Sequence, residues 1–562
     1  MSMIEKERRP LKEDMRIGVF ICNCGSNIAG HLDCKAVTQY AATLPGVVFA
    51  KENLYTCSEA GVGEIQGAIS EHNLNRVVVA SCSPRTHQPL FQSSCSQAGL
   101  NPYLFEMVNI RDQCSWVHMQ NRDEATEKAK DLVRMGVAKA AFLEPQNDIE
   151  SSLINRILVI GGGVAGLSAA ESLSGMGLEV VVVEKGSELG GLLRQINQVA
   201  PEGDKAIDRI SALIETIKSK SNIKIYLDSE VEAVDGYIGN YEVTVQPKAG
   251  ASIQERVGCI VVATGAAPLK PVGLYGYDGK SVITQMELEE LLLNGADLAQ
   301  RIVMIQCVGA RCPEREYCSR ICCMTAVKNA MIIKEQKPDA KVHILYRDMQ
   351  MYGTEKERML WDARGMGVRF DVYDAEQPPV VENGTVRFYQ LLMGEQQEIP
   401  YDLLVLSTPL IANEDAPKLS QLMRVPMDQN HFFMEAHAKL RPLDFATDGI
   451  FVCGSARYPA TVTEARSQGL GVASRVATIL FKDKLITSAI VAEINPETCV
   501  GCMGCMDMCP YGAIGYLPEK NICEVNTILC KGCGCCAATC PSQSAQLKGF
   551  KPQQILSQIR AA

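Results

Sequence analysis

The stretch Arg156-Ile157-Leu158-Val159-Ile160-Gly161-Gly162-Gly163-Val164-Ala165-Gly166 decides how the middle of this chain folds. Its first half is typical of a buried β-strand, its second half satisfies G-x-G-x-x-G, and a helix pattern follows. The next strand-like run, 179–183, ends in Glu184, about 20 residues after the glycines, as a dinucleotide fingerprint requires. We expect a pyrophosphate at the helix N-terminus and a ribose on Glu184. The candidate contacts are Gly161, Gly163, Val164, Ala165, Gly166 and Glu184.

Three further segments favour FAD over NAD as the dinucleotide. They are 190–193 (GGLL), 262–265 (VATG) and 447–454 (TDGIFVCG), all typical of flavoprotein reductases. The last would place the N-terminus of a helix, expected over 461–470, near the isoalloxazine ring. Ser455 stands where such flavoproteins often carry Asp. The additional candidate contacts are Lys185, Gly191, Leu192, Ala263, Thr264, Gly265, Gly454 and Thr461.

A second α/β unit, about 280–400, carries cysteines where a second glycine-rich loop would stand in a two-domain flavin reductase. A strand-like run, 301–305, precedes Cys307-Val308-Gly309-Ala310-Arg311-Cys312, and a helix-like run, 324–334, follows Cys322 and Cys323. No G-x-G-x-x-G is present there to hold the pyrophosphate of NAD(P)H. We therefore predict an iron–sulfur cluster in place of the pyridine nucleotide. A disulfide between Cys322 and Cys323 is the alternative.

The C-terminal part, about 486–548, repeats the pattern C-x2-C-x2-C-x3-C-P. This is the pattern of a two-cluster bacterial ferredoxin, in which the fourth cysteine of each run binds the other cluster. Cys523 and Cys535 are surplus to it, and zinc is the alternative metal. The predicted ligands are Cys499, Cys502, Cys505 and Cys540 for one 4Fe–4S cluster, and Cys530, Cys533, Cys536 and Cys509 for the other.

The composition agrees with a metal-rich protein of about three or four domains. Of the 24 cysteines in 562 residues, seven lie before residue 120, five within 307–323 and ten within 499–540. A net charge of −10 argues against nucleic acid and anionic membranes as partners. No apolar run approaches the ~18–20 residues of a membrane span, and the charged N-terminus, 1–16, lacks a signal core. We expect a cytoplasmic protein with no transmembrane segment, in which cysteines serve metal rather than disulfides.

The N-terminal region, 16–140, is predicted to form a smaller α/β unit. Strand-like runs at 16–21 and 76–80 each end in a loop with cysteine, and a long helix is expected over 122–142.

Taken together, these features resemble the A subunit of heterodisulfide reductase, the flavin-bearing subunit of methanogens, and related subunits of other anaerobes. The resemblance spans essentially the full length. Methanogen versions often carry an additional ferredoxin module inserted in the flavin domain, and no such run stands between 190 and 300. The segments that carry the resemblance are 19–25 (VFICNCG), 82–87 (CSPRTH), 101–106 (NPYLFE), 114–118 (CSWVH), the central cysteines and the ferredoxin tail.

The resemblance implies an α/β fold: a thioredoxin-reductase-like, two-lobed FAD flavoprotein between an N-terminal α/β iron–sulfur domain and a C-terminal 2×4Fe–4S ferredoxin domain. The expected domains are 1–145 (iron–sulfur), 146–280 and 401–485 (FAD), 281–400 (second α/β domain) and 486–562 (ferredoxin).

The resemblance also implies the remaining ligands, for a total of one FAD and four 4Fe–4S clusters. Lys328 lies where the family places a lysine near flavin N5, a solvated helix lysine being the alternative, and Glu287 is a candidate carboxylate on the flavin side. Cys312 is spare, and Cys22 competes with Cys24. The implied ligands are Cys307, Cys318, Cys322 and Cys323 for the cluster close to the flavin, and Cys24, Cys57, Cys82 and Cys114 for the N-terminal cluster.

An FAD accepts two electrons and can release them singly. The resemblance implies an oxidoreductase that performs flavin-based electron bifurcation or relay. The implied partners are heterodisulfide-reductase B- and C-like subunits, a hydrogenase, formate dehydrogenase or NADH module, ferredoxin and a second copy of the chain. The alternatives are a self-contained NAD(P)H-dependent reductase, which would need a second glycine fingerprint, and an electron-wire scaffold with a silent flavin.

Overall fold

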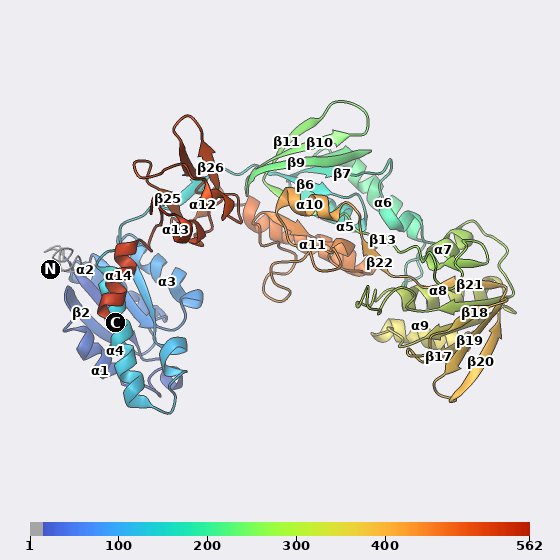
Figure 1. Ribbon diagram of the computed structural model, residues 1–562, viewed down its shortest axis with the longest axis horizontal. Coiled ribbons are helices and arrows are strands. Elements are labelled where there is room, and N and C mark those ends of the chain that lie inside the picture. The colour runs from blue at the N-terminus through green and yellow to red at the C-terminus, as the bar shows by residue number, and fades with distance from the viewer. Residues whose placement is uncertain (1–14) are drawn as a thin grey trace. The chain divides into compact units, whose positions relative to one another are not determined.

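The computed structural model describes residues 15–562, so the expectation about the charged N-terminus falls largely outside the described residues. The chain divides into two compact units, one made of 1–150 with 486–562 and one made of 151–485 (Figure 1). Within residues 15–562, no helix is both long and apolar enough to cross a membrane.

The first unit begins with a four-stranded parallel sheet in the order β2-β1-β3-β4. Strands β1 and β3 are almost wholly buried, as expected for continuous apolar runs in a parallel sheet. Because all four strands are parallel, their carboxyl ends meet at one edge, and the cysteine loops follow those ends. The elements are β1 (Ile17–Cys22), α1 (Cys34–Ala41), β2 (Val47–Asn53), α2 (Glu59–Glu71), β3 (Arg76–Ser81), α3 (Pro84–Gln97), β4 (Phe105–Asn109) and α4 (Arg122–Ala140).

The C-terminal part of the same unit is a small module built around cysteines. Two antiparallel pairs, β25 with β28 and β26 with β27, enclose two short helices, α12 and α13. The last helix, α14, lies along α4 (Figure 1), where the Gln554 side chain donates to the carbonyl of Phe142 at 2.9 Å. The elements are β25 (Ala492–Ile494), α12 (Gly504–Asp507), β26 (Ile514–Leu517), β27 (Ile522–Val525), α13 (Cys535–Thr539), β28 (Ala545–Leu547) and α14 (Pro552–Ala561).

The second unit contains two lobes, and the first is a five-stranded parallel sheet in the order β23-β12-β6-β7-β8. Apolar residues of α5, α6 and α11 pack on one face, and the antiparallel sheet β9–β11 packs on the other. The helix expected over 461–470 is longer, because buried apolar positions continue to its end. The elements are β6 (Arg156–Ile160), α5 (Val164–Gly175), β7 (Glu179–Val183), α6 (Ala206–Ser219), β8 (Ile223–Tyr226), β9 (Ser229–Tyr237), β10 (Asn240–Pro247), β11 (Ile253–Val257), β12 (Cys259–Val262), α10 (Ala416–Met423), β23 (Ile450–Val452) and α11 (Val462–Leu480).

The second lobe repeats this plan, with the sheet order β14-β21-β15-β16-β17. In each lobe a helix follows the central strand, α5 after β6 and α8 after β15. The chain crosses between the lobes at β13 (Ala266–Pro268) and β22 (Leu410–Ala412), which pair with each other. The elements are β14 (Val282–Thr284), α7 (Gln285–Leu293), β15 (Arg301–Ile305), α8 (Cys322–Gln336), β16 (Lys341–Tyr346), α9 (Thr354–Gly365), β17 (Arg369–Val372), β18 (Val380–Glu382), β19 (Thr385–Gln390), β20 (Glu395–Pro400) and β21 (Leu403–Leu406).

Candidate functional site

The three glycines of the G-x-G-x-x-G motif between β6 and α5 are required for different structural reasons. A Cβ on Gly161, whose φ is +109°, would overlap the carbonyl oxygen of Ala263, and a Cβ on Gly166 would overlap the carbonyl oxygen of Gly161. A Cβ on Gly163 would instead meet nothing within 4 Å. Gly161 and Gly166 are therefore needed for close packing. Gly163 instead leaves free space at the N-terminus of α5, where a pyrophosphate can approach the backbone.

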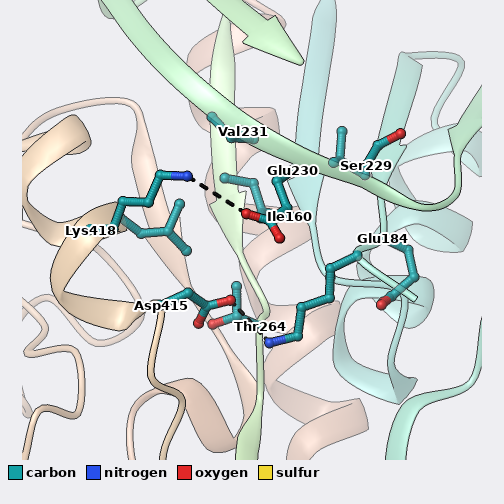
Figure 2. A pocket seen from close by; sticks show the side chains of 12 residues that line it. Ile160, Glu184, Ser229, Glu230, Val231, Thr264, Asp415 and Lys418 are labelled. Atoms are coloured by element: carbon teal, nitrogen blue, oxygen red, sulfur yellow. Dashed lines mark hydrogen bonds and ion pairs between the residues drawn. The ribbon is translucent and has the colours of Figure 1, made fainter. Parts of the chain in front are cut away.

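A pocket lies beside this loop, and Glu184, Thr264 and Asp415 are among the residues that line it (Figure 2). Glu184, at the end of β7, accepts hydrogen bonds from the backbone N–H groups of Gly162 at 2.6 Å and Gly186 at 2.7 Å. Thr264 Oγ1 and Asp415 Oδ1 are buried and have no hydrogen-bond partner in the described part of the chain. Buried polar atoms of this kind are costly unless they are paired, so the pocket offers unfilled hydrogen-bonding positions to a polar ligand.

A larger cavity of about 340 Å³ extends from the glycine loop to α8. Two of the expected contacts, Gly166 and Gly454, do not line it. A Cβ on Gly454 would lie 2.7 Å from the Cβ of Ala165, so this glycine too permits close packing. Ser455 does line the cavity. The expected contacts that line it are Gly161, Gly163, Val164, Ala165, Glu184, Lys185, Gly191, Leu192, Ala263, Thr264, Gly265 and Thr461.

Lys328 reaches this cavity from α8 and forms a buried ion pair with Glu289 of α7. Its ammonium also donates to the carbonyl of Gln198 at 3.1 Å, and Glu289 accepts from the backbone N–H of Asn197 at 2.9 Å. Burial lowers the pKa of Lys328, and the carboxylate of Glu289 acts against that shift. The pair places an exchangeable proton at the wall of the cavity.

The expectation for Glu287 is wrong in its placement. Its carboxylate accepts the backbone N–H of Thr284 at 2.7 Å, in a capping box, and the hydroxyl of Tyr277 at 2.6 Å, and it does not line the cavity. Met286 and Glu289, three residues apart on one face of α7, both line it. The Thr-x-x-Glu signal of a capping box could have identified Glu287 as the residue that caps the start of this helix.

The central cysteines converge at the carboxyl end of β15. Burial raises the pKa of Cys322, and the neighbouring thiols of Cys323, Cys307 and Cys318 add to that rise. Cys307 has a left-handed backbone, with φ +63°, which turns the chain sharply after the strand. Cys312 instead pairs by its backbone with Arg315. The structure therefore brings the four expected ligands near one another, and the spare Cys312 lines the same cavity as Cys307.

Helix α8 begins at Cys322, so Cys318 lies in the loop before the helix. All 24 cysteines lie in the described residues and carry free thiols, so Cys322 and Cys323 are not joined.

The buried side-chain amide of Gln306, next to Cys307, could form hydrogen bonds with a group bound at these cysteines. Gln306 is 1% exposed, and neither its Nε2 nor its Oε1 has a partner among the described residues. Within residues 15–562, no three or more His, Cys, Asp or Glu side chains are arranged to hold a single metal ion. The cysteines that bind the four irons of a 4Fe–4S cluster lie farther apart than the ligands of a single ion, so a cluster site need not have that arrangement. Hydrogen-bond donors near the sulfurs are part of such cluster sites.

In the C-terminal module the cysteines line two separate pockets. Each pocket combines three cysteines of one run with the fourth of the other. Backbone N–H groups donate to the sulfurs, for example Ala513 to Cys509 at 3.3 Å and Ala545 to Cys540 at 3.4 Å. Such N–H···S contacts suit iron–sulfur thiolates. The first pocket has Cys499, Cys502, Cys505 and Cys540, with Cys523; the second has Cys530, Cys533, Cys536 and Cys509, with Cys535.

In the N-terminal sheet, cysteines gather at the carboxyl edge. Burial raises the pKa of Cys22, and the thiols of Cys24 and Cys57 add to it. Burial also raises the pKa of Cys82, where Cys57 again contributes. The thiol of Cys114, in a π-helical turn, donates instead to a backbone carbonyl of α4 at 3.0 Å. Three expected ligands thus lie near one another, with Cys22 beside them, and Cys114 points to the helix.

His87 is the histidine that contacts this group. Its Nδ1 lies 3.2 Å from the sulfur of Cys82, at the start of α3. This contact of a histidine with a candidate ligand is a finding of the structure.

Comparison with known proteins agrees with this organisation. The family described as "Pyridine nucleotide-disulphide oxidoreductase" matches residues 155–469, and "4Fe-4S binding domain" matches residues 492–515. Among solved structures, a thioredoxin reductase of T. acidophilum is 14% identical, with a TM-score of 0.42, over 58% of this chain and 99% of that one.

Similar curated proteins cover nearly the whole chain. The second iron–sulfur A subunit of CoB–CoM heterodisulfide reductase from Methanopyrus kandleri is 37% identical over 91% of this chain and 92% of its own length. The A subunit of H(2):CoB-CoM heterodisulfide,ferredoxin reductase from Methanothermobacter marburgensis is 36% identical over 99% of both. The protein of the same name from Methanothermobacter thermautotrophicus aligns over 657 positions with all of this 562-residue chain. That relative therefore carries residues without a counterpart here.

Proposed function

The chain belongs to the family of heterodisulfide reductase A subunits and is an oxidoreductase with FAD and 4Fe–4S clusters; from this we propose that it is the bifurcating flavin subunit of a heterodisulfide-reductase-like complex. The observation that carries the proposal is the loop after β15. In the second lobe that loop holds four convergent cysteines, where the first lobe has its glycine loop. A flavin whose neighbouring nucleotide position is taken by cysteines exchanges electrons through iron and sulfur.

Bound FAD would supply a centre that takes up two electrons and gives them up one at a time. The chain's own part would be to hold it: Gly163 leaves room where the pyrophosphate would lie, and Glu184 would accept from the ribose. We assign the flavin end of the cavity to Lys328 and Glu289. Lys328 would hold a proton there, and Glu289 acts to keep that proton on the lysine against the effect of burial.

We propose four 4Fe–4S clusters, each held by one of the cysteine groups described above. The central group is next to the flavin cavity, since Met324 and Lys328 of α8 line the cavity and Cys322 and Cys323 begin the same helix. The N-terminal and C-terminal groups would carry electrons toward partner proteins. For the N-terminal cluster we retain Cys24, Cys57, Cys82 and Cys114, with Cys22 as the competitor for Cys24; to bind iron, Cys114 would give up its hydrogen bond to the carbonyl of Ala125.

We propose B- and C-like subunits, an electron-input module and ferredoxin as partners. The relatives' names mention heterodisulfide and ferredoxin as the substances on which those proteins act. A longer relative has residues without a counterpart in this chain, and we infer that they include the inserted ferredoxin module, which would leave this chain with fewer relay sites.

The test is anaerobic turnover of the complex purified through this chain. With an electron donor present, we expect ferredoxin to be reduced only while a higher-potential acceptor is reduced too. If ferredoxin reduction continues at the same rate without the acceptor, the chain relays electrons and does not bifurcate them. If NAD(P)H alone bleaches the flavin of the isolated chain rapidly, the function is that of a self-contained reductase. If the flavin is not reduced and reoxidised even with all partners present, the chain is an electron-wire scaffold with a silent flavin.

A further inference from the structure

Arg320 lies between two of the central cysteines in an unusual backbone conformation. Its φ is +65°, a left-handed value that a non-glycine residue keeps only where the surrounding structure holds it. Its backbone N–H donates to the sulfur of Cys318 at 3.3 Å. The backbone of Arg320 is therefore part of the cysteine loop, and the direction of its side chain follows from that strained turn.

The side chain of Arg320 leaves its own lobe and reaches the FAD lobe. Its Nη2 donates to Glu464 Oε1 of the FAD lobe at 2.6 Å and to the hydroxyl of Tyr352, in its own lobe, at 2.6 Å. Its Nη1 donates to the carbonyl of Pro459 at 3.4 Å, and the guanidinium lies 5.2 Å from the ring centre of Tyr458. A planar, always charged guanidinium can satisfy several such contacts at once, which a lysine ammonium cannot do in the same geometry.

The partner carboxylate is itself fixed at the start of α11. Glu464 Oε2 accepts the backbone N–H of Thr461 at 2.9 Å, and Thr461 Oγ1 accepts the backbone N–H of Glu464 at 3.2 Å. Thr461 lines the cavity assigned to FAD. Arg320 thus joins the cysteine loop at one end to the wall of the flavin cavity at the other.

The cysteine loop also rests on the connection between the lobes. The hydroxyl of Tyr317 donates to the carbonyl of Leu410 at 2.8 Å, and the hydroxyl of Ser319 accepts the N–H of Leu410 at 3.1 Å. Leu410 begins β22, one of the two paired strands that cross between the lobes. Two strands form a narrow connection about which lobes can turn, and a bond made away from it, such as Arg320–Glu464, resists that turning.

We propose that Arg320 is a positioning residue that holds the central cluster at one distance from the flavin. The electron step it serves is a single one: the reduced flavin is oxidised by one electron, and the cluster is reduced by that electron. The proposal rests on the proposed function, in which the central cysteines hold this cluster. Arg320 touches neither the ring nor the iron and acts through Glu464.

The experiment compares full-length, cluster-loaded variants in the same anaerobic preparation. Arg320→Met removes the contacts, Arg320→Lys keeps only the charge, and Glu464→Gln weakens the same ion pair from the other lobe while the sequence of the cysteine loop stays unchanged. Arg301→Met is the matched control, because Arg301 pairs with Asp402 at the opposite end of β15 without leaving its lobe. The readouts are FAD and iron content, the magnetic interaction between the one-electron-reduced flavin and the cluster, and the rate of flavin-to-cluster transfer after flash photoreduction.

We expect Arg320→Met and Glu464→Gln to keep FAD and iron, to weaken the magnetic interaction and to slow transfer several-fold, because electron transfer slows steeply as the distance between two centres grows. Arg320→Lys should be intermediate and Arg301→Met unchanged. Because the two partners act as one unit, Arg320→Met with Glu464→Gln should be no slower than Arg320→Met alone.

The proposal is overturned if Glu464→Gln has the transfer rate and the magnetic interaction of the wild type. This result decides the matter even if Arg320→Met loses its cluster and cannot be compared. If the wild-type chain itself contains no cluster at the central cysteines, the proposed function fails instead.

Discussion

Changing Gly163 to alanine should separate the binding of FAD from the folding of the lobe that binds it. Gly163 is the N-cap of α5, with φ −81° and ψ −179°, which alanine adopts without strain. Its Cβ would meet nothing within 4 Å. Because the added methyl group points into the space assigned to the pyrophosphate, the cost should fall on the complex with FAD and not on the protein alone.

The expected magnitude follows from overpacking. An extra methyl group in a tightly packed site costs about 1–3 kcal/mol, so FAD should bind about 5- to 150-fold more weakly. The unfolding midpoint of the FAD-free protein should change little, because most substitutions without a new contact stay within about 0.5 kcal/mol. FAD affinity is measured by titrating FAD-free protein and following flavin fluorescence, and stability is measured by thermal unfolding of the same samples.

Two other glycines of the same helix provide the comparison. Gly166→Ala should destabilise the lobe by about 3 kcal/mol, because its Cβ would overlap backbone that cannot move freely. Gly175→Ala, at the end of α5, meets nothing within 4 Å and should stabilise the helix by up to about 1 kcal/mol without altering FAD affinity. If Gly163→Ala binds FAD as tightly as the wild type, the pyrophosphate does not lie at this loop.

Three further predictions concern the cysteines and the buried ion pair. Cys323→Ala should lose the iron of one cluster by metal analysis and keep its FAD; loss of FAD with all iron retained would contradict the central site. Cys540→Ala should lose the EPR signal of one ferredoxin-type cluster, whereas Cys535→Ala should keep the signals of both clusters. The opposite result would make Cys535 the ligand and Cys540 the surplus cysteine. Glu289→Gln removes the charge that raises the pKa of Lys328, so that pKa should fall further, and the pH at which the flavin midpoint potential changes slope should move to lower pH. An unchanged slope would mean that Lys328 does not couple to the flavin.

The local motifs could be predicted from the sequence because their geometry is local. The strand, glycine loop and helix of 156–175 are determined by short-range backbone requirements, and the structure has them as expected. The fold class follows from this unit and is shown by the family match. The pairing of Cys540 with the first ferredoxin run was also accessible, because the doubled motif implies the crossing.

The carboxylate that faces the cavity could not be chosen in the same way. Glu287 and Glu289 are two residues apart on one helix, and only the direction of each side chain separates them. Glu287 turns back to cap α7, and Glu289 faces the cavity, where it meets Lys328 from another helix. Which of two nearby carboxylates faces a cavity depends on where α7 lies against α8, and helix packing is a property of the folded lobe.

The sequence by itself determined the class of fold, the flavin and iron–sulfur chemistry, and the places of the motifs that carry them, because each depends on residues within a few turns of one another. Only the tertiary structure decided which distant residues meet. Arg320 and Glu464 are 144 positions apart and have no shared motif, yet their side chains lie 2.6 Å apart. Contacts of that separation arise when the two lobes pack, and packing depends on all of their surfaces together rather than on any local pattern.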